Sequence, residues 1–230
     1  MMRRLLTRLR RDERGFTLPE LLIAMPIGII VLLAAFFTLD SSVVLTGKVT
    51  DRVDRTQRAR VAMEGITRRL RSQVCPTVGQ PALISADDYS VKFYSFLGTR
   101  PFVPDIREIA WDTNTNTIVE RKWAGTGTAP NTTWAATPTA STVLSDVKPT
   151  FASGNSGPRG PVFKYYLGSS QTPLTTPLSA ANLAATSRIG LSFMTYAQGR
   201  NLTGPAETMQ NDVFVRTADP NAISTTPDCA

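Results

Sequence analysis

The longest apolar run of the chain lies near its N-terminus. Residues 21–39 are 19 residues without a charge, bounded by Glu20 and Asp40. At about 1.5 Å per residue, a helix of this length spans ~28 Å, close to the ~30 Å hydrocarbon core of a bilayer. The run therefore predicts a membrane-spanning helix.

A helical pattern continues beyond the apolar run, in residues 40–75. Its apolar side chains recur at spacings close to three and four, and arginines occupy much of the rest. The stripe consists of Val49, Val53, Met63, Ile66, Leu70 and Val74. Pro76 is expected to end the helix. The pattern predicts an amphipathic stalk whose stripe packs on a folded body.

Beyond Pro76 the period changes to two, which is typical of half-buried strands. Residues 89–97 place Val91, Phe93 and Leu97 on one face, and residues 188–197 place Ile189, Leu191 and Phe193 on another. The remaining candidate strands are residues 107–112, 117–123, 162–167 and 212–217.

Residues 107–112 and 117–123 are predicted to form a hairpin, because the polar residues 113–116 between them favour a turn. In this hairpin Ile109 and Trp111 are expected to face Val119 and Trp123.

Two stretches carry little to bury. Residues 124–160, rich in Gly, Thr, Ala, Ser and Pro, are predicted to be a loop or weakly ordered insertion, and residues 171–181 a second loop. The predicted fold class is α+β: one long N-terminal helix, half transmembrane and half amphipathic, packed on an antiparallel β-sheet.

The charge is unevenly distributed. The net charge is +7, of which residues 1–15 contribute +4 and residues 48–74 contribute +5, while Glu20 and Asp40 subtract two. Residues 75–230 carry eleven basic and eleven acidic side chains and are neutral. The folded body thus gives no whole-protein argument for a nucleic-acid partner.

The composition does not favour catalysis. The chain has no histidine, which removes the usual general base and the commonest transition-metal ligand. Its two cysteines do not form a C-x-x-C pair, so a structural zinc site is excluded. We expect a protein that is not an enzyme and that holds no metal or cofactor.

The arginines before the apolar run set its orientation. Six arginines precede it, whereas residues 40–54 hold Lys48 and Arg52 as their basic residues. The positive-inside bias places the N-terminus in the cytoplasm and the body outside. The run exceeds the roughly 7–15 apolar residues of a cleaved signal peptide. The simplest interpretation is a single-pass signal anchor with an extracytoplasmic domain.

A more specific motif precedes the run. A basic leader ends at Gly15, and Phe16-Thr-Leu-x-Glu20 and the apolar residues follow. Together these features resemble the N-terminus of type IV prepilins and pseudopilins. The resemblance implies that prepilin peptidase cuts after Gly15 on the cytoplasmic side and that the new N-terminal Phe16 is N-methylated. It also implies that Glu20 aligns an incoming subunit by pairing with a neighbour's N-terminal ammonium.

Physical chemistry allows two roles for Glu20. A carboxylate at full depth in the hydrocarbon costs ~2.5–3.5 kcal/mol and less near the interface, so it needs a partner. Cleavage after Gly15 would create an ammonium at Phe16, one helical turn away, and a pair between chains would fix axial register. The alternative is a capping box, since Thr17 to Glu20 fits T-x-x-E. The two roles are compatible.

Two prolines depart from the family pattern. Pro19 stands before Glu20, within the first turn, where the missing N–H is tolerated. Pro26 lies deeper, removes the hydrogen bond to the Leu22 carbonyl and is expected to kink or loosen the helix. Local unwinding on assembly would centre on residues 22–28. A plain kinked anchor is the alternative.

The stalk suggests a subtype and a second hypothesis. Residues 59–71 are similar to PilW-like minor pilins and J-type minor pseudopilins more than to major pilins. Arg52, Arg55, Arg58 and Arg60 would contact phosphates if the stalk bound DNA during uptake. The alternative is a solvated helix face with Asp51–Arg55 and Glu64–Arg68 pairs.

Cys75 ends the stalk and Cys229 is the penultimate residue. Outside the cytoplasm we expect them to form a disulfide. On the chain-entropy model, this bond would stabilise the folded state by ~4–5 kcal/mol. Two free thiols are the alternative.

These inferences combine into one hypothesis. Residues 1–15 are a leader, 16–39 a transmembrane or filament-core helix, 40–75 a stalk, and 76–230 a β-rich extracytoplasmic domain with the loop 124–160. The chain is a minor pilin or pseudopilin of a type IV pilus or type II secretion filament. Its partners are prepilin peptidase, other pilins and the cytoplasmic (inner) membrane. The alternatives are an uptake or adhesion module that binds DNA or a surface ligand, and a plain signal-anchored surface domain.

Overall fold

The computed structural model describes residues 17–98, 102–127, 131–152, 157–197 and 206–215. The chain divides into two compact units, Met1–Thr50 and Asp51–Ala230. The described part of the first unit is helical after Thr17, and the second unit contains the sheets.

One long helix, α2, spans Leu18–Arg71 without interruption. Its acidic residue Glu20 lies in the first turn and Arg68, Arg69 and Arg71 lie in the last, which suits the helix dipole at both ends. Pro26 lies inside the helix and does not end it.

The helix ends at Arg71 because the next residues turn into the sheet. Gln73 forms a bridge with Ser95. The Val74 amide donates to the Tyr94 carbonyl at 3.1 Å. The chain therefore leaves the helical path before it reaches Pro76, so the proline is not what stops the helix.

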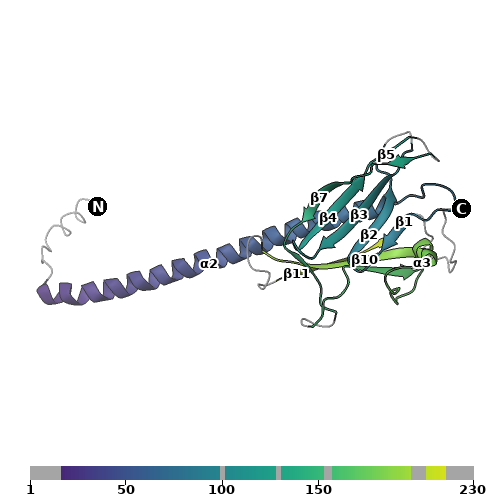
Figure 1. The fold of residues 1–230 in the computed structure, drawn as a ribbon. Coiled ribbons are helices and arrows are strands. Elements are labelled where there is room, and N and C mark those ends of the chain that lie inside the picture. The colour runs from purple at the N-terminus through teal and green to yellow at the C-terminus, as the bar shows by residue number, and fades with distance from the viewer. Residues whose placement is uncertain (1–16, 99–101, 128–130, 153–156, 198–205, 216–230) are drawn as a thin grey trace, which may run out of the picture. The chain divides into compact units, whose positions relative to one another are not determined.

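The first sheet is five-stranded and antiparallel, in the order β1-β2-β3-β4-β7 (Figure 1). Its strands are β1 (Leu83–Ala86), β2 (Ser90–Ser95), β3 (Asp105–Asp112), β4 (Thr117–Trp123) and β7 (Thr139–Leu144).

The second sheet is built around its longest strand, β10, which pairs with β11 along one edge and with β8 and β9 in succession along the other. These strands are β8 (Val147–Pro149), β9 (Phe163–Leu167), β10 (Thr186–Thr195) and β11 (Glu207–Phe214). The short pair β5 (Gly125–Thr126) and β6 (Thr133–Trp134) and the helix α3 (Ala180–Ala185) complete the described elements.

Both sheets and the end of α2 share one hydrophobic core. The helix contributes Met63, Ile66 and Leu70, of which Ile66 and Leu70 are fully buried. The predicted α+β class, a long N-terminal helix packed with antiparallel sheets, is confirmed. The predicted burial of the apolar stripe is confirmed for these three residues, whereas Val49 and Val53 are 61% and 50% exposed.

The predicted inward faces are confirmed in β10, where Ile189, Leu191 and Phe193 are fully buried. In β2, Val91 and Phe93 are also buried, but Leu97 is 52% exposed. The alternation fails at Leu97 because β2 ends at Ser95.

The predicted hairpin is confirmed as β3 and β4, joined by a turn in which Asn116 adopts φ 53°. Its predicted register is wrong by one residue. Ile109 lies opposite Glu120 and Trp111 opposite Ile118, so Val119 and Trp123 belong to the other face. The inward side of β4 consists of Ile118 and Glu120.

The loop predicted for residues 124–160 is corrected by the structure. This stretch contains β5, β6, β7 and β8, and β7 is a full strand of the first sheet. Thr139, Ala140, Ser141 and Thr142 in β7 are exposed and are held by the main-chain ladder to β4, whereas Leu144 at the end of the strand is buried in the core.

Candidate assembly surface of the N-terminal helix

Glu20 lies in the first turn of α2, at the start of the apolar run. The hydroxyl of Thr17 donates to a carboxylate oxygen of Glu20 at 3.4 Å. The amides of Glu20 and Leu21 donate to the Thr17 carbonyl at 3.0 and 3.2 Å, which closes the first turn. Thr17 directly precedes the first helical residue, but the described contact of its hydroxyl is with the Glu20 side chain and not with a helix amide, as the capping box of T-x-x-E would have it. The hydroxyl contact is long and leaves the carboxylate able to accept from another group.

The helix surface that follows is apolar and uncovered. Residues 18–50 are all exposed, including Leu22 at 67%, Ile30 at 65% and Phe37 at 73%. Among the described residues, this helix alone is long and apolar enough to cross a membrane, with a mean hydropathy of 2.6 in its most apolar window. Burying such a surface is worth about 25 cal/mol per Å², so a lipid or protein environment is strongly favoured over water.

The hydroxyl groups on this surface carry their own hydrogen-bond partners. Thr38 donates to the Ala35 carbonyl at 2.8 Å. Further along, Ser42, Thr46 and Thr50 each donate to the carbonyl four residues earlier, at 2.8, 2.8 and 3.0 Å. Ser41 donates to the Thr38 carbonyl at 3.0 Å. These groups can leave water without losing a partner, which removes most of the cost of burying them.

The stalk arginines lie in the second unit and are mostly engaged. Arg52 pairs with Glu207 of β11 at 2.8 Å, and Arg58 pairs with Asp54 at 2.9 Å. Arg55 is 6% exposed, so it cannot present its charge to a nucleic acid as the DNA hypothesis requires. Arg60 is exposed. The four positions therefore do not form a continuous basic track.

A buried ion network that was not predicted from the sequence joins the helix to the first sheet. Glu120 is 5% exposed and accepts from Arg69 of α2 at 2.7 Å and from Arg107 of β3. Asp105 lies beside Arg107 and pairs with Lys122 at 2.9 Å. The only signal for this network in the sequence is a glutamate on what becomes an inward position of a strand.

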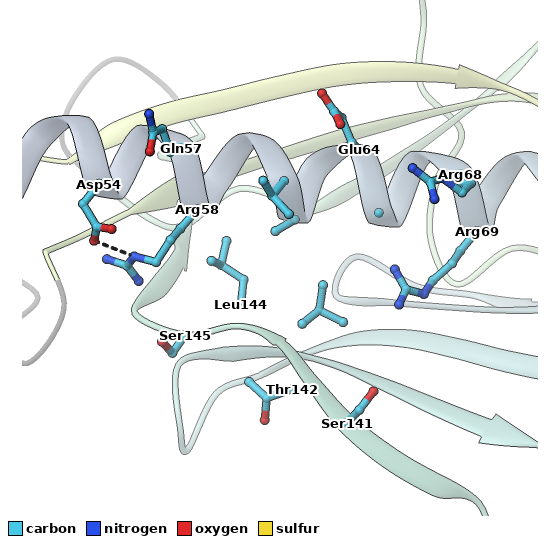
Figure 2. A pocket seen from close by; sticks show the side chains of 14 residues that line it. Asp54, Gln57, Arg58, Glu64, Arg68, Arg69, Ser141, Thr142, Leu144 and Ser145 are labelled. Carbon is cyan, nitrogen blue, oxygen red and sulfur yellow. Dashed lines mark hydrogen bonds and ion pairs between the residues drawn. The ribbon is translucent and has the colours of Figure 1, made fainter.

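A groove of about 820 Å³ lies between the stalk part of α2 and β7. Figure 2 shows Arg58 and Arg69 pointing from the helix toward the strand that carries Ser141 and Thr142, while Glu64 points away. Leu144 and Ala62 supply apolar floor. The groove shows where helix and sheet meet in the second unit.

Several predicted site residues lie outside the described part of the chain. These are Gly15, Phe16 and Cys229. Cys75 is half-buried just beyond the helix and is not a free thiol. The Cys75–Cys229 pairing, the cleavage position and the methylation position therefore stay predictions.

Comparison with known proteins gives one finding. Residues 10–36 match the prokaryotic N-terminal methylation motif. No curated protein matches the chain. The matched segment contains the Gly15–Phe16 junction, Glu20 and most of the apolar run. This motif marks structural proteins of the pilin type, which are not enzymes. The motif and the exposed apolar helix behind it fit a membrane-anchored surface filament protein, and they support a protein of the type IV prepilin or pseudopilin type.

Proposed function

We propose that this chain is a minor pilin or pseudopilin, a structural subunit of a type IV pilus or a type II secretion filament. Prepilin peptidase cuts it after Gly15, Phe16 becomes the methylated N-terminus, and the helix then enters a filament. Its neighbours are other pilins, and before assembly it resides in the cytoplasmic membrane with its N-terminus inside.

One observation carries this proposal: a methylation motif at residues 10–36 leads directly into a helix whose residues 18–50 are all exposed. A plain anchor needs only about 20 apolar residues. Here the uncovered apolar surface continues past Asp40 through Val43, Val44 and Leu45, which are 71%, 50% and 61% exposed. A surface longer than a bilayer core is suited to burial among neighbouring helices.

Glu20 acts in this proposal as the acceptor for an N-terminal ammonium. Thr17 supplies one long hydrogen bond to the carboxylate, at 3.4 Å, which does not neutralise its charge. An ammonium at Phe16, from the same chain or an adjoining subunit, supplies the counter-ion that a carboxylate beside hydrocarbon requires. Pairing between chains would add axial register to the otherwise non-directional apolar contact.

Two further features belong to the proposed subunit, a disulfide and a bend in the helix. Cys75 and Cys229 form a disulfide that holds the C-terminal tail near the end of the helix, and Pro26 supplies a point at which the helix can bend. The similarity of residues 59–71 to PilW-like minor pilins and J-type minor pseudopilins favours a minor subunit. A DNA-uptake or adhesion role is less favoured, because Arg52, Arg55 and Arg58 have partners within the chain.

Incorporation into filaments tests the proposal. Cells that assemble native filaments would express the full chain or its Glu20→Ala variant, and sheared filaments would be probed for the subunit. We expect wild-type incorporation and loss of the Glu20→Ala variant from the filament fraction, with both chains present in the membrane. Glu64→Ala, which removes an exposed acid from the stalk, is the matched control and should incorporate normally. Equal incorporation of all three chains would contradict the proposed role of Glu20.

A further inference from the structure

Strand β7 is an edge of the first sheet that the described part of the chain leaves unpaired. It pairs with β4 on one side, and no other main-chain hydrogen bond among the described residues reaches residues 139–144. The outer edges of β1 and β9 differ. The Ala86 carbonyl accepts from the Leu178 amide at 3.1 Å, and the Tyr165 carbonyl accepts from Leu174 at 2.8 Å. The outer edge of β7 therefore presents main-chain groups that another chain can bind.

The sequence of β7 does not protect this edge. Thr139–Leu144 contains no charge and no proline, the residues that commonly prevent an edge strand from pairing. The irregularity in the β4–β7 register lies beyond Thr142, so residues 139–142 keep a regular ladder. These four residues are exposed. At about 3.3 Å per residue they offer ~13 Å of regular strand edge.

The groove beside this edge has the stalk part of α2 as its second wall (Figure 2). Gln57, Val61 and Arg68 line it at spacings of four and seven residues, so they share one face of the helix. All three are exposed, Val61 at 71%. A strand added to β7 at a distance of ~4.8 Å would turn alternate side chains toward this wall, as β4 turns Glu120 toward Arg69.

The charge of this wall favours an acidic partner. Arg58 and Arg69 also line the groove, but each already has an acidic partner, at 2.9 and 2.7 Å. Arg68 is exposed and forms no ion pair with a described residue. Figure 2 shows Glu64, one helical turn before Arg68, pointing away from the groove. The groove thus offers one arginine whose charge is not neutralised.

We propose that an extended acidic segment of a different filament subunit adds to β7 as a further strand and places a carboxylate on Arg68. The inference rests on the proposed filament function and names a surface through which this subunit binds a neighbour. Main-chain hydrogen bonds to β7 supply affinity. The helix wall supplies specificity, because Val61 selects an apolar side chain and Arg68 an acidic one.

Segments of this chain itself suit the groove less well. If β7 of a second copy paired with β7, it would bring residues 139–144, which hold no acid for Arg68. The C-terminal residues 221–226, which lie between two prolines, hold no acid either. The carboxylate is therefore expected from a different protein.

Site-specific cross-linking in cells tests the inference. Cells that assemble native filaments would express the full chain with a photo-cross-linking amino acid in place of Ala140, an exposed residue of β7 that does not line the groove. After illumination, mass spectrometry would map the cross-linked peptides in the membrane and filament fractions together. We expect a cross-link to another pilin, within a stretch that carries an acid.

Charge reversal then identifies the contact of Arg68. Arg68→Glu should lower the cross-linking yield by about tenfold, and Arg68→Gln should lower it less. Exchange of the mapped acid of the partner for lysine should restore the yield with Arg68→Glu. Arg60→Glu makes the same change of charge at an exposed helix position that does not line the groove, and it should leave the yield unchanged.

The other outcomes overturn the inference. A cross-link to a second copy or within the same chain would show that β7 has a different occupant, and no cross-link in either fraction would show that the edge stays unpaired. A full yield with Arg68→Glu would exclude the acidic contact. The proposed function is judged separately. A chain that is processed and incorporated but not cross-linked refutes the inference alone, whereas a chain that keeps its leader and stays out of filaments refutes the function.

Discussion

Glu120 of β4 and Arg69 of α2 form an ion pair at 2.7 Å that joins the helix to the first sheet. The carboxylate is 5% exposed, and Arg107 of β3 binds its other oxygen. The apolar contacts of Ile66 and Leu70 hold the helix against the core, but they tolerate sliding. A buried, directional ion pair fixes the position at which Arg69 stands over β4.

Removal of the Glu120 charge should destabilise the second unit. Glu120→Gln leaves the buried Arg107 with Asp105 at 3.6 Å as its remaining acidic partner, whereas the partly exposed Arg69 can turn to water. We expect the free energy of unfolding to fall by about 3 kcal/mol. Denaturant unfolding of the full chain in detergent, followed by tryptophan fluorescence, measures the change.

The control for this variant is Arg121→Gln. Arg121 pairs with Glu108 across the same two strands at 3.2 Å, but with 37% and 22% exposed side chains. Arg121→Gln should lower the free energy of unfolding by less than about 1 kcal/mol. Equal effects of the two substitutions would show that burial of Glu120 has no energetic consequence.

Gly65 supports this ion pair indirectly. A Cβ at this position would lie 2.8 Å from Nη1 of Arg69, so glycine leaves room for the guanidinium. In a helix, Gly→Ala ordinarily stabilises by about 1 kcal/mol. We expect Gly65→Ala to give no gain in the native chain and the ordinary gain when Arg69→Ala is already present. A double-mutant cycle of unfolding free energies measures the coupling, and a gain of equal size in both backgrounds would refute the steric explanation.

Burial could be predicted from the sequence where it follows the period of the apolar residues. Ile189, Leu191 and Phe193 are inward because the alternation of β10 is unbroken. The hairpin register is missed because Glu120 occupies an inward position, and a charged residue in a pattern is taken to face solvent. Only the tertiary contacts with Arg69 and Arg107 make that position favourable.

Strand β7 is missed for a different reason. It consists largely of Thr, Ala and Ser and exposes its first four residues, so it has no apolar alternation to detect. The strand forms because its main chain pairs with β4, and main-chain pairing cannot be recognised from the side chains of a single sequence. At the candidate site, the apolar surface and Glu20 were predictable from the sequence, whereas the internal hydrogen bonds of the hydroxyls required the structure.

Tyr165 should make the stability of the second unit depend on pH in alkaline solution. Burial raises its pKa well above 10, and nearby Asp87 and Asp88 raise it further. The unfolded chain releases this proton near pH 10 and the folded chain does not, so stability is constant below about pH 10 and falls above it. Tyr165→Phe should flatten this decline.

The same substitution has a fixed cost at neutral pH. The hydroxyl of Tyr165 shares its one hydrogen between the carbonyls of Asp87 at 3.1 Å and Ser90 at 3.0 Å, and phenylalanine loses this shared hydrogen bond. We expect a loss of about 1 kcal/mol at pH 7. Chemical unfolding at a series of pH values separates the two effects, and an unchanged alkaline slope in the variant would exclude Tyr165 as the titrating group.

Pro26 should locally weaken a helix that is otherwise continuous. It has no N–H to donate to the Leu22 carbonyl, and Gly28 nearby has open space around its Cα. In Pro26→Ala we expect amide hydrogen exchange of residues 27–30 in lipid nanodiscs to slow relative to the native chain. Exchange that is equally slow in both chains would show that Pro26 is not a weak point.

The proposed function requires that this chain is a substrate of prepilin peptidase. Intact mass and N-terminal sequencing of the chain after co-expression with a prepilin peptidase test this requirement. We expect loss of residues 1–15, a methylated Phe16 as the first residue, and no processing of Gly15→Ala. A native chain that keeps its leader, or is cut elsewhere and equally in Gly15→Ala, would contradict it and leave a simple anchored domain.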